Sequence, residues 1–394
     1  MGELGEIMTG STPSTSKSEY YSEDGIPWVT PTDINSQTIS DTPRKLSGEG
    51  IKVGRVVPAN TILCTCIASI GKNTLLTVKG SFNQQINCLT PNEYNDAYFL
   101  LTESEIWSNI MKRMAAAGTM QIVNKTEFSE LTTMVPKLEE QKKIGQYFHT
   151  IGHLITLHQR KCETLQKLKK SMLQKMFPKN GSCFPEIRFA GFTDAWELRK
   201  LSLSFDILQN NTLSRSELSI ENGAARNVHY GDILVKYGEV LDLKTEELPF
   251  IQSSQTVDKL KGSFLQNGDI IMADTAEDET AGKCTEIANL DNMNVLAGLH
   301  TIPLRPKQKY AVGYLGYYMN SGSFHDKLLP LMQGTKVTSI SKSALQGMSI
   351  LRPADLEEQR QIGTYFRTLD RLITLHQRKQ KKPFLSYNNH NIQA

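Results

Sequence analysis

A 24-residue segment occurs twice in this chain, with 218 positions between the two starting points. Residues 138–161 read LEEQKKIGQYFHTIGHLITLHQRK, and residues 356–379 read LEEQRQIGTYFRTLDRLITLHQRK. Seventeen of the 24 positions are identical, including LEEQ at the start and LITLHQRK at the end. Because internal repetition constrains architecture more than any local motif does, we expect two half-molecules in tandem.

Both copies have the pattern of an amphipathic helix. Apolar side chains recur at alternating steps of three and four residues, which is the spacing of a heptad seam. A single amphipathic helix cannot bury such a stripe alone, so we expect the two helices to pack on each other as an antiparallel coiled coil. Pro178 and Gly181 predict the end of the first helix, and Pro383 predicts an end or a kink in the second. The seam consists of Ile144, Phe148, Ile151, Ile155, His158, Cys162, Leu165, Met172 and Met176 in the first helix and of Ile362, Phe366, Leu369, Ile373 and His376 in the second.

Each half has room for a core of its own, since 394 residues suit two domains of roughly 150 residues with connecting helices. The repeat then divides the chain into alternating domains and helices. The predicted segments are a domain at 1–137, a central helix at 138–180, a second domain at 181–355, a C-terminal helix at 356–382 and a tail at 383–394.

The two domains have strand-like runs separated by Gly, Pro and Asn, and then helical stretches, at comparable places. This order predicts an α+β fold for both domains. The strand-like runs are Val56 to Cys66, Phe82 to Pro91, Ser263 to Thr275 and Val295 to Pro306, and the helical stretches are Ala97 to Ala117 and Tyr310 to Met332.

Positive charge is concentrated on the repeated helices. Residues 1–137 and 181–355 carry net charges of −3 and −4, whereas residues 138–180 and 356–382 carry +6 and +4. Such helices would meet a polyanion or an acidic protein surface, although a solvated basic face explains the pattern as well. The basic side chains of the first helix are Arg160, Lys161, Lys167, Lys169, Lys170 and Lys175.

The six cysteines show no C-x-x-C spacing, which argues against a disulfide framework and a zinc site. The first residues lack a basic flank followed by an apolar run, and no stretch is long and apolar enough to span a bilayer. We therefore expect a soluble, cytoplasmic protein with reduced cysteines, no membrane association and no metal.

No catalytic motif is complete in this sequence. Ser69 to Asn73 partly matches a phosphate loop, but Cys66 replaces the first glycine and Asn73 replaces Ser or Thr, so a turn before a strand is favoured. His149 and His153 are one helical turn apart without the glutamate of a metalloprotease motif, which leaves a solvated or DNA-facing role. The carboxylates from Asp274 to Glu279 predict an exposed loop. An enzyme in its own right, a nuclease or a methyltransferase, is thus disfavoured but stays open.

Several motifs together resemble those of the specificity subunit of type I restriction-modification systems. They occur in order along nearly the whole chain, and a Gly-Thr pair precedes each LEEQ segment by about 20 residues. The motifs are GSTPS at Gly10 to Ser14, GIPWVTPTDI at Gly25 to Ile34, SIGK at Ser69 to Lys72, NQQIN at Asn83 to Asn87 and GFTDAWELRKL at Gly191 to Leu201.

The resemblance implies two target-recognition domains, each reading one half of a split, asymmetric site in double-stranded DNA. It also implies that the two helices act as a spacer and dock methyltransferase subunits, with a restriction and translocation subunit in the same complex. The chain itself would be non-catalytic and would need no cofactor. The side chains expected at the subunit interface are Ile144, Phe148, Ile151, Ile155, Leu165, Met172, Ile362, Phe366, Leu369 and Ile373.

Candidate DNA contacts are basic and amide side chains on loops that differ between the halves. Asn and Gln can pair bidentately with adenine and Arg or Lys with guanine, while other lysines would hold phosphates. For any one residue a structural role in a polar strand or turn remains open. The candidates are Arg44, Lys45, Lys72, Asn83, Gln84 and Gln85 in the first domain and Lys236, Lys283, His300, Lys336 and Ser339 in the second.

Both ends of the chain look shorter than the repeat predicts. Alignment of Leu4 with Leu201 leaves no counterpart to Trp196, and the second helix lacks a match to residues 163–177. We therefore expect an apolar stripe on the first helix, at Leu165, Leu168, Met172 and Met176, to be exposed and to promote self-association. The alternative function is a truncated or silent specificity subunit that joins partners through its coiled coil without recognising DNA independently.

Overall fold

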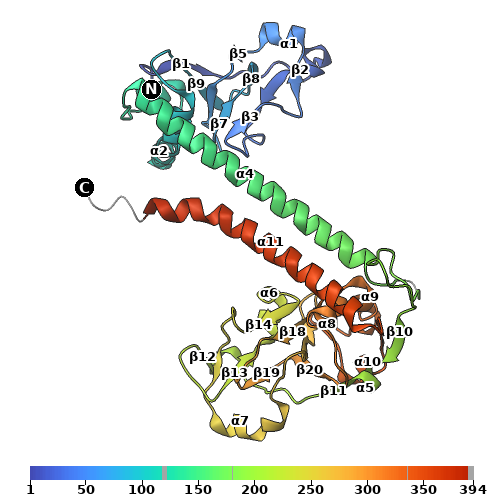
Figure 1. Cartoon of the computed structure of the whole chain (residues 1–394). Coiled ribbons are helices and arrows are strands. Elements are labelled where there is room, and N and C mark those ends of the chain that lie inside the picture. Colours follow the sequence, from blue (N-terminus) through green and yellow to red (C-terminus); the bar gives the residue numbers. More distant parts are fainter. Residues whose placement is uncertain (118–121, 180, 335, 389–394) are drawn as a thin grey trace. The chain divides into compact units, whose positions relative to one another are not determined.

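The computed structural model describes residues 1–117, 122–179, 181–334 and 336–388, with side chains up to residue 379. The chain forms two compact units: unit 1 is Met1–Leu157 together with the end of the chain from Ser386, and unit 2 is His158–Leu385. The long helix α4, Leu138–Lys175, contributes its first part to unit 1 and its last part to unit 2 (Figure 1).

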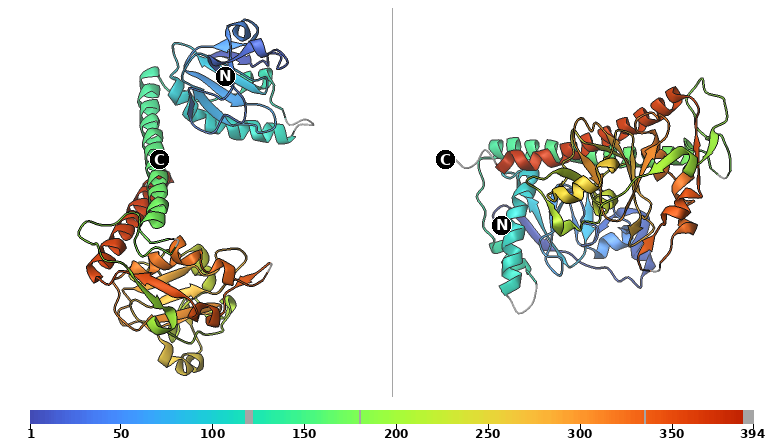
Figure 2. Two further views of the ribbon diagram at one scale, coloured as in Figure 1. Left: turned by 90° about the vertical axis from the view of Figure 1, so that its right-hand side faces the viewer. Right: turned by 90° about the horizontal axis from the view of Figure 1, so that it is seen from below.

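Unit 1 is built on a five-stranded sheet in the order β1-β9-β6-β7-β3, in which only β3 and β7 are parallel. Helix α2, Ala97–Ala117, covers one face of this sheet, packing on β6 and β7 (Figure 2). All five residues of β6 are buried because it is the central strand, covered on both faces. The strands are β1 Gly5–Thr9, β3 Thr38–Ile39, β6 Thr61–Thr65, β7 Asn73–Leu76 and β9 Ile86–Pro91.

A second, smaller sheet of unit 1 has the order β4-β2-β8-β5. It packs on the other face of the large sheet through a core that includes Val29, Leu63, Leu76 and Phe82. Its strands are β2 Tyr21–Val29, β4 Lys45–Leu46, β5 Val56–Val57 and β8 Gly80–Phe82, and the remaining elements are η1 Ser18–Tyr20, α1 Gly48–Val53 and α3 Lys125–Glu130.

Unit 2 repeats the topology of the large sheet and of three strands of the small sheet, but the fourth strand of its small sheet, β12, pairs with β15, whereas β5 of unit 1 pairs with β8. Its large sheet has the order β11-β20-β16-β18-β14 with one parallel pair, β14 and β18, and its small sheet has the order β12-β15-β13-β19. The expected α+β fold is therefore present twice. The strands are β11 Phe205–Ile207, β12 Leu218–Ser219, β13 Ala225–Val228, β14 Val240–Asp242, β15 Phe250–Ile251, β16 Ile270–Ala273, β18 Cys284–Ala288, β19 Val295–Ala297 and β20 Thr301–Pro306.

The helical stretch expected from Tyr310 to Met332 is wrong as a single helix, because it is divided into three short pieces. Ser321 adopts an extended backbone and ends the first piece, and its hydroxyl donates to the carbonyl of Tyr318. The remaining elements of unit 2 are two strand pairs, β10 Glu197–Lys200 with β22 Ser349–Arg352 and β17 Thr275–Ala276 with β21 Thr338–Ser339, and the helices α5 Leu201–Ser204, η2 Arg215–Glu217, α6 Tyr230–Val235, α7 Ser254–Lys259, η3 Lys261–Ser263, α8 Tyr314–Asn320, α9 Gly322–His325, η4 Leu329–Leu331, α10 Lys342–Gln346 and α11 Leu356–Asn388.

The structure also corrects the alignment of the two halves at their starts. In unit 2 the N–H of Leu201 donates to the carbonyl of Met348 at 2.9 Å. At the equivalent position of unit 1 the amino group of Met1 donates to the carbonyl of Leu131 at 2.6 Å. Met1, and not Leu4, therefore corresponds to Leu201. A short turn at Met1 to Leu4 occupies the place of α5, so the sequence alignment was displaced by three residues.

The repeated glutamine of LEEQ joins each domain to its long helix. The side chains of Gln141 and Gln359 are buried, and each accepts a hydrogen bond from a backbone N–H of its domain and donates one to the carbonyl of a proline just before the helix. An unpaired backbone group at this buried junction would be costly. The partners are Asp96 and Pro136 for Gln141, at 2.9 and 2.8 Å, and Ala311 and Pro353 for Gln359, at 3.1 and 2.9 Å.

The repeated glycine, four residues after the glutamine, allows the same close approach. A Cβ atom at Gly145 would collide with the side chain of Asp96, and one at Gly363 would collide with the backbone of Val312. The identical QxxIG spacing in the two copies thus has a packing explanation.

In unit 2 the last part of α4 and helix α11 run antiparallel, as the seam predicts. His158 and His376, which occupy the same position of the repeat, are joined by a hydrogen bond of 2.9 Å between their Nδ1 atoms. Further along, Phe177 stacks on Phe366 with ring centroids 5.9 Å apart. Helix α11 does not end at Pro383, because it continues to Asn388.

The expected exposed stripe on α4 is mostly buried. Leu165 and Met176 belong to the core of unit 2, and Met172 packs against that core, so only Leu168 is exposed. Residues of α8 belong to the same core as Leu165 and Met176, so the body of unit 2 covers this stripe. Helix α8 lies between the sheet and α11 (Figure 1), and the ring centroids of Tyr317 and Phe366 are 5.0 Å apart.

The lysine that interrupts the seam has a structural role. The ammonium of Lys169 lies 2.9 Å from Glu239 and 2.7 Å from Asp370, and it sits over the ring of Tyr317. Burial acts to lower the pKa of Lys169, but the two carboxylates outweigh burial and raise it. Lys169 therefore ties α4 to α11 and to the body of unit 2, which differs from the free basic residue expected.

Substitution of Ile373 by Asp should destabilise unit 2 by about 3 kcal/mol or more, because Ile373 is 8% exposed and its replacement would bury an unpaired charge. The neighbouring Leu372 is 38% exposed, so Leu372→Asp should change the free energy of unfolding by no more than about 0.5 kcal/mol. Chemical unfolding of both variants measures the difference. Equal stabilities would contradict the packing of α11.

Candidate nucleic-acid interface

The loop at Gly10 to Ser14 is the centre of a polar surface on unit 1. Its backbone pairs with β8 through the N–H of Ser11 and the carbonyl of Phe82, at 2.9 Å. The ring N–H of Trp28 donates to the carbonyl of Ser11 at 3.1 Å, and the hydroxyl of Tyr21 donates to the carbonyl of Pro13 at 2.7 Å. The GSTPS and GIPW motifs therefore belong to one local structure.

The amides of the NQQIN motif lie against this loop. Asn83 donates to the hydroxyl of Thr12 at 3.3 Å and accepts from the N–H of Gln85 at 2.7 Å, which forms a tight turn after β8. The turn leaves Gln84 exposed, with its carbonyl oxygen hydrogen-bonded to Thr12. The three amide candidates of unit 1 are thus brought together.

Arg44 and Lys45 differ in how their charges are held. The guanidinium of Arg44 lies over the rings of Tyr21 and Trp28, 5.4 and 5.9 Å from their centroids. Lys45 instead pairs with Asp41 at 2.9 Å.

The SIGK motif forms a turn before β7, which is the structure that the sequence favours over a phosphate loop. Gly71 has a left-handed backbone with φ of 84°, and the turn leaves Lys72 exposed. The N–H of Gly71 donates to the carbonyl of Thr65 at 2.9 Å and closes the turn.

Two candidates of unit 2 occupy the positions of candidates in unit 1. The carbonyl of Lys72 accepts from the N–H of Thr65, and the carbonyl of Lys283 accepts from the corresponding N–H of Ala273, both at 2.9 Å. The register of β9 and β20 in the same way places His300 where unit 1 has Gln85. The two domains therefore present different side chains on one backbone frame.

His300 lies in a polar cluster at that edge of unit 2. Its backbone is left-handed, with φ of 55°, and its ring is within 3.5 Å of both Asp274 and Thr275 and packs edge-on against Tyr230. Thr275 pairs with Ser339 in the β17–β21 ribbon, so the structure brings His300 and Ser339 together. Lys336 is exposed in the loop before β21, and the Gly-Thr pairs fall partly on residues 118, 119 and 335, outside the described residues.

Two lysine candidates of unit 2 are engaged inside the chain. The ammonium of Lys283 is half-buried and donates to the carbonyl of Leu234 at 2.8 Å, and burial lowers its pKa. Lys236 pairs with Glu246 at 3.2 Å. Lys283 is turned away from solvent and is a poor candidate for a phosphate contact.

The side chains expected at the subunit interface divide into two groups. Those of α11, namely Ile362, Phe366, Leu369 and Ile373, and Leu165 of α4 are buried inside unit 2. In unit 1, Ile144 packs against the domain core, and Phe148, Ile151 and Ile155 are half-buried. Met172 also packs on the core of unit 2.

Among the described residues no group of three or more His, Cys, Asp or Glu side chains could hold a metal ion. His149 packs against Tyr98 with ring centroids 4.4 Å apart, and both His149 and His153 are exposed. Of the carboxylates expected on an exposed loop, Glu277, Asp278 and Glu279 are exposed, whereas Asp274 is half-buried and accepts a hydrogen bond from the hydroxyl of Thr275. None of the helices in the described part of the chain is long and apolar enough to cross a membrane.

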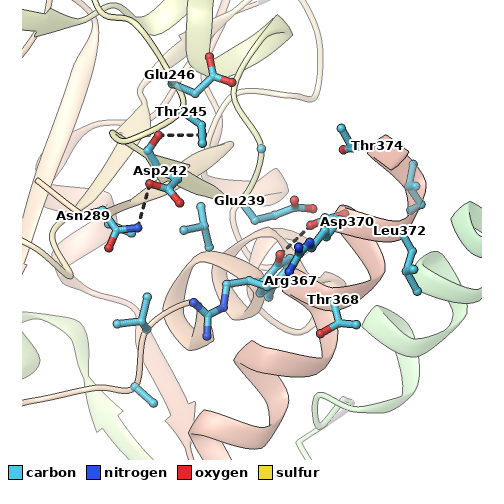
Figure 3. Close-up of a pocket in the computed structure, with 18 of the residues that line it drawn as sticks. Glu239, Asp242, Thr245, Glu246, Asn289, Arg367, Thr368, Asp370, Leu372 and Thr374 are labelled. Carbon is cyan, nitrogen blue, oxygen red and sulfur yellow. Dashed lines mark hydrogen bonds between the residues drawn. The ribbon is translucent and has the colours of Figure 1, made fainter. Parts of the chain in front are cut away.

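Unit 2 also contains a groove of about 1650 Å³ between α11 and the loop that follows β14 (Figure 3). Acidic and basic side chains line it, and most of the acids are paired within the chain: Glu239 and Asp370 with Lys169, and Asp242 with Asn289 at 2.8 Å. Arg367 donates to the carbonyl of Gly363 at 3.4 Å. Of the residues that the sequence indicated, Lys169 and Ile373 line the groove.

Beneath this groove Glu286 is fully buried. Its carboxylate accepts hydrogen bonds from the N–H groups of Gly313, at 2.7 Å, and Gly316, at 2.9 Å, at the start of α8. Burial raises its pKa to about 7, although these N–H groups and Arg367 act in the opposite direction. Strand register places Leu75 at the same position of unit 1, so the buried acid is specific to unit 2.

The model of the type I restriction modification DNA specificity domain matches residues 1–167 and 194–382 of this chain. The chain belongs to this family. This family comprises the specificity subunits of type I restriction-modification systems. The match confirms the family that the motifs resemble.

Two specificity subunits illustrate the range of similarity. The MjaVIII subunit of Methanocaldococcus jannaschii is 25% identical over 338 residues, which cover 83% of this chain and 76% of that subunit. The HindI subunit of Haemophilus influenzae is 30% identical over 158 residues, 38% of this chain, and the match spans about a third of that subunit's length, 34%.

A solved S subunit of a type I system from M. genitalium has the same fold. It superimposes with a TM-score of 0.59 at 12% identity, covering 98% of this chain and 92% of that chain. The agreement supports an architecture of two target-recognition domains and two repeated helices.

Glu286→Gln should reduce the pH dependence of stability. Folded Glu286 keeps its proton up to about pH 7, whereas the unfolded group releases it near pH 4.5, so the free energy of unfolding falls as pH rises between these values. The penalty above pH 7 is on the order of 3 kcal/mol, and the glutamine variant should lack it. Chemical unfolding at pH 5 and pH 8 measures this, with the exposed Glu277→Gln as a control that keeps the wild-type dependence. Parallel pH profiles for wild type and Glu286→Gln would contradict the assignment.

Proposed function

We propose that this specificity subunit recognises a bipartite, asymmetric target in double-stranded DNA, with one half read by residues 1–137 and the other by residues 181–355. The observation that supports this is the pair of domains with the same strand order in the large sheet and different side chains at matching positions. Gln85 corresponds to His300, and the exposed Lys72 corresponds to the engaged Lys283. A shared frame with different side chains suits two different half-sites.

In unit 1 the contacts proposed for base edges come from the amides beside the Gly10 to Ser14 loop. Gln84 is exposed, and Asn83 and Gln85 flank it in the same turn. Carboxamides can pair bidentately with adenine in the major groove. Lys72, on the neighbouring turn, is placed for a phosphate contact, which would set register without selecting sequence.

In unit 2 the corresponding contacts come from His300 and Ser339 at the edge of the large sheet, with Lys336 beside them. Their groups are hydrogen-bond donors and acceptors for base edges or phosphates. Lys236 and Lys283 are left out of this set because each is engaged within the chain.

The helices are proposed to set the gap between the half-sites and to dock methyltransferase and restriction subunits. Helix α4 has 38 residues, which corresponds to a length of about 57 Å. Once the size of the domains themselves is allowed for, that length suits an unspecified gap on the scale of one duplex turn or slightly more. In unit 1 the outer face of α4 exposes Tyr147, Leu154 and Leu157 beside Lys142 and Lys143, a combination that suits a protein partner.

Exchange of residues 1–137 for the matching domain of a relative tests the bipartite target. Selection from random duplex DNA should return a site in which one half has changed and the other half is the same, because base contacts are local to each domain. A change in both halves would show joint reading. A single contiguous motif for the unexchanged chain would contradict the bipartite target, whereas no motif at all would contradict DNA recognition and favour a coiled-coil interaction protein.

The exposed lysines of the last part of α4 test whether this helix also faces DNA. Lys167 and Lys170 are exposed, whereas Lys169 is buried among carboxylates and is left unchanged. The double variant Lys167→Gln, Lys170→Gln should weaken binding evenly across sequences and reduce the slope of affinity against salt by about two, if both hold phosphates. The comparison is Lys142→Gln, Lys143→Gln, which should affect subunit binding instead. An unchanged salt slope for the first pair would assign it to solvent or to a protein partner.

A further inference from the structure

Arg44 differs from the other basic side chains around the Gly10 to Ser14 loop. The guanidinium of Arg55 bonds the carbonyl of Thr9, and Lys45 pairs with Asp41. In the part of the chain that the structure describes, the Arg44 guanidinium meets neither a carboxylate nor a carbonyl, and the residue is exposed. Its N–H donors are therefore available to a ligand.

Two aromatic rings that contact each other form the surface beneath Arg44. The rings of Tyr21 and Trp28 meet edge to face with centroids 5.9 Å apart, and Trp28 is 2% exposed. Each ring also donates a hydrogen bond to the loop, to the carbonyls of Pro13 and Ser11. Stacking on such rings restricts the planar guanidinium and leaves its N–H edge uncovered.

The same loop connects Arg44 to the amide candidates. The carbonyls of Ser11 and Pro13 accept hydrogen bonds from the side chains of Trp28 and Tyr21. The hydroxyl of Thr12, between them, is hydrogen-bonded to the side chains of Asn83 and Gln84. Arg44, the loop and the amides therefore form one continuous surface within unit 1. A DNA edge that reaches Gln84 would pass next to Arg44.

We propose that Arg44 is a specificity-determining residue that reads a guanine in the half-site of unit 1; this inference rests on the proposed DNA recognition by that unit. The guanidinium fork matches the O6 and N7 acceptors that guanine presents in the major groove, and no other base presents two acceptors there. A phosphate contact needs only a positive charge, which a flexible lysine supplies as well. The held orientation of Arg44 suits base reading.

Binding of the full chain to duplex DNA tests the assignment. Selection from a random library defines the site for wild type, and single-base variants of that site are then measured for wild type, Arg44→Ala and Arg44→Lys. One half-site is the half that changes when residues 1–137 are exchanged for the domain of a relative. At one position of that half-site, wild type should bind guanine about tenfold or more tightly than the other bases. Arg44→Ala should lose that preference and Arg44→Lys should retain only part of it, while the other half-site stays unchanged. Arg44→Lys should retain the wild-type salt dependence, because its charge is kept.

Arg113→Ala is the matched control, because Arg113 is an exposed arginine of the same unit on α2, the helix that packs on β6 and β7. It should keep the full preference for guanine.

An even loss of affinity over all bases in Arg44→Ala that is restored in Arg44→Lys would make Arg44 a phosphate contact and overturn the assignment. Unchanged base preferences in both variants, with melting temperatures equal to that of wild type, would overturn it as well. If the wild-type chain selects no sequence, the proposed function fails first, and the role of Arg44 fails with it.

Discussion

The hydrogen bonds of Gln141 and Gln359 to backbone groups hold each sheet domain on its long helix. At both junctions an N–H at the start of a domain helix and a proline carbonyl are buried together, and one carboxamide satisfies both. A carboxamide is suited to this because it donates and accepts at the same time. With the glutamine in place, the glycine one turn later lets the domain backbone approach the helix. The rest of each unit depends on this contact, because it sets how the sheet is attached to the helix.

The two domains use one frame for two surfaces. The strand order of the large sheet and the two parallel pairings are the same, and the turn before β7 and β18 closes on a left-handed glycine in both cases, Gly71 and Gly282. Loops at the edge of the large sheet carry the differences. This separation lets side chains at the edge vary without loss of the core, which a protein that selects a sequence requires.

Unit 2 contains ionisable side chains in or near its core, and at one of these positions unit 1 has an apolar side chain. Lys169 is held between Glu239 and Asp370, and Glu286 is buried against the start of α8, at the position of Leu75 in unit 1. Buried charges of this kind are tolerated only when hydrogen bonds and partners compensate for the lost hydration. They join α4, α11 and the body of unit 2 through directional contacts, in addition to the apolar seam.

The sequence by itself determined the repeat, the two α+β domains, the seam and the family, because these depend on periodicity and on the order of motifs. It also predicted the strands at Val56 to Cys66 and Val295 to Pro306 and the single helix at Ala97 to Ala117. Only the tertiary structure decided which side chains are free. In the sequence Lys169 and Lys283 look like free basic residues. In the structure Lys169 forms a salt bridge with Glu239, and Lys283 donates a hydrogen bond to the carbonyl of Leu234. The apolar stripe of α4 is covered by the body of unit 2, and Trp28 and Tyr21 form the surface under Arg44, because these contacts join segments far apart in the chain and leave no local pattern.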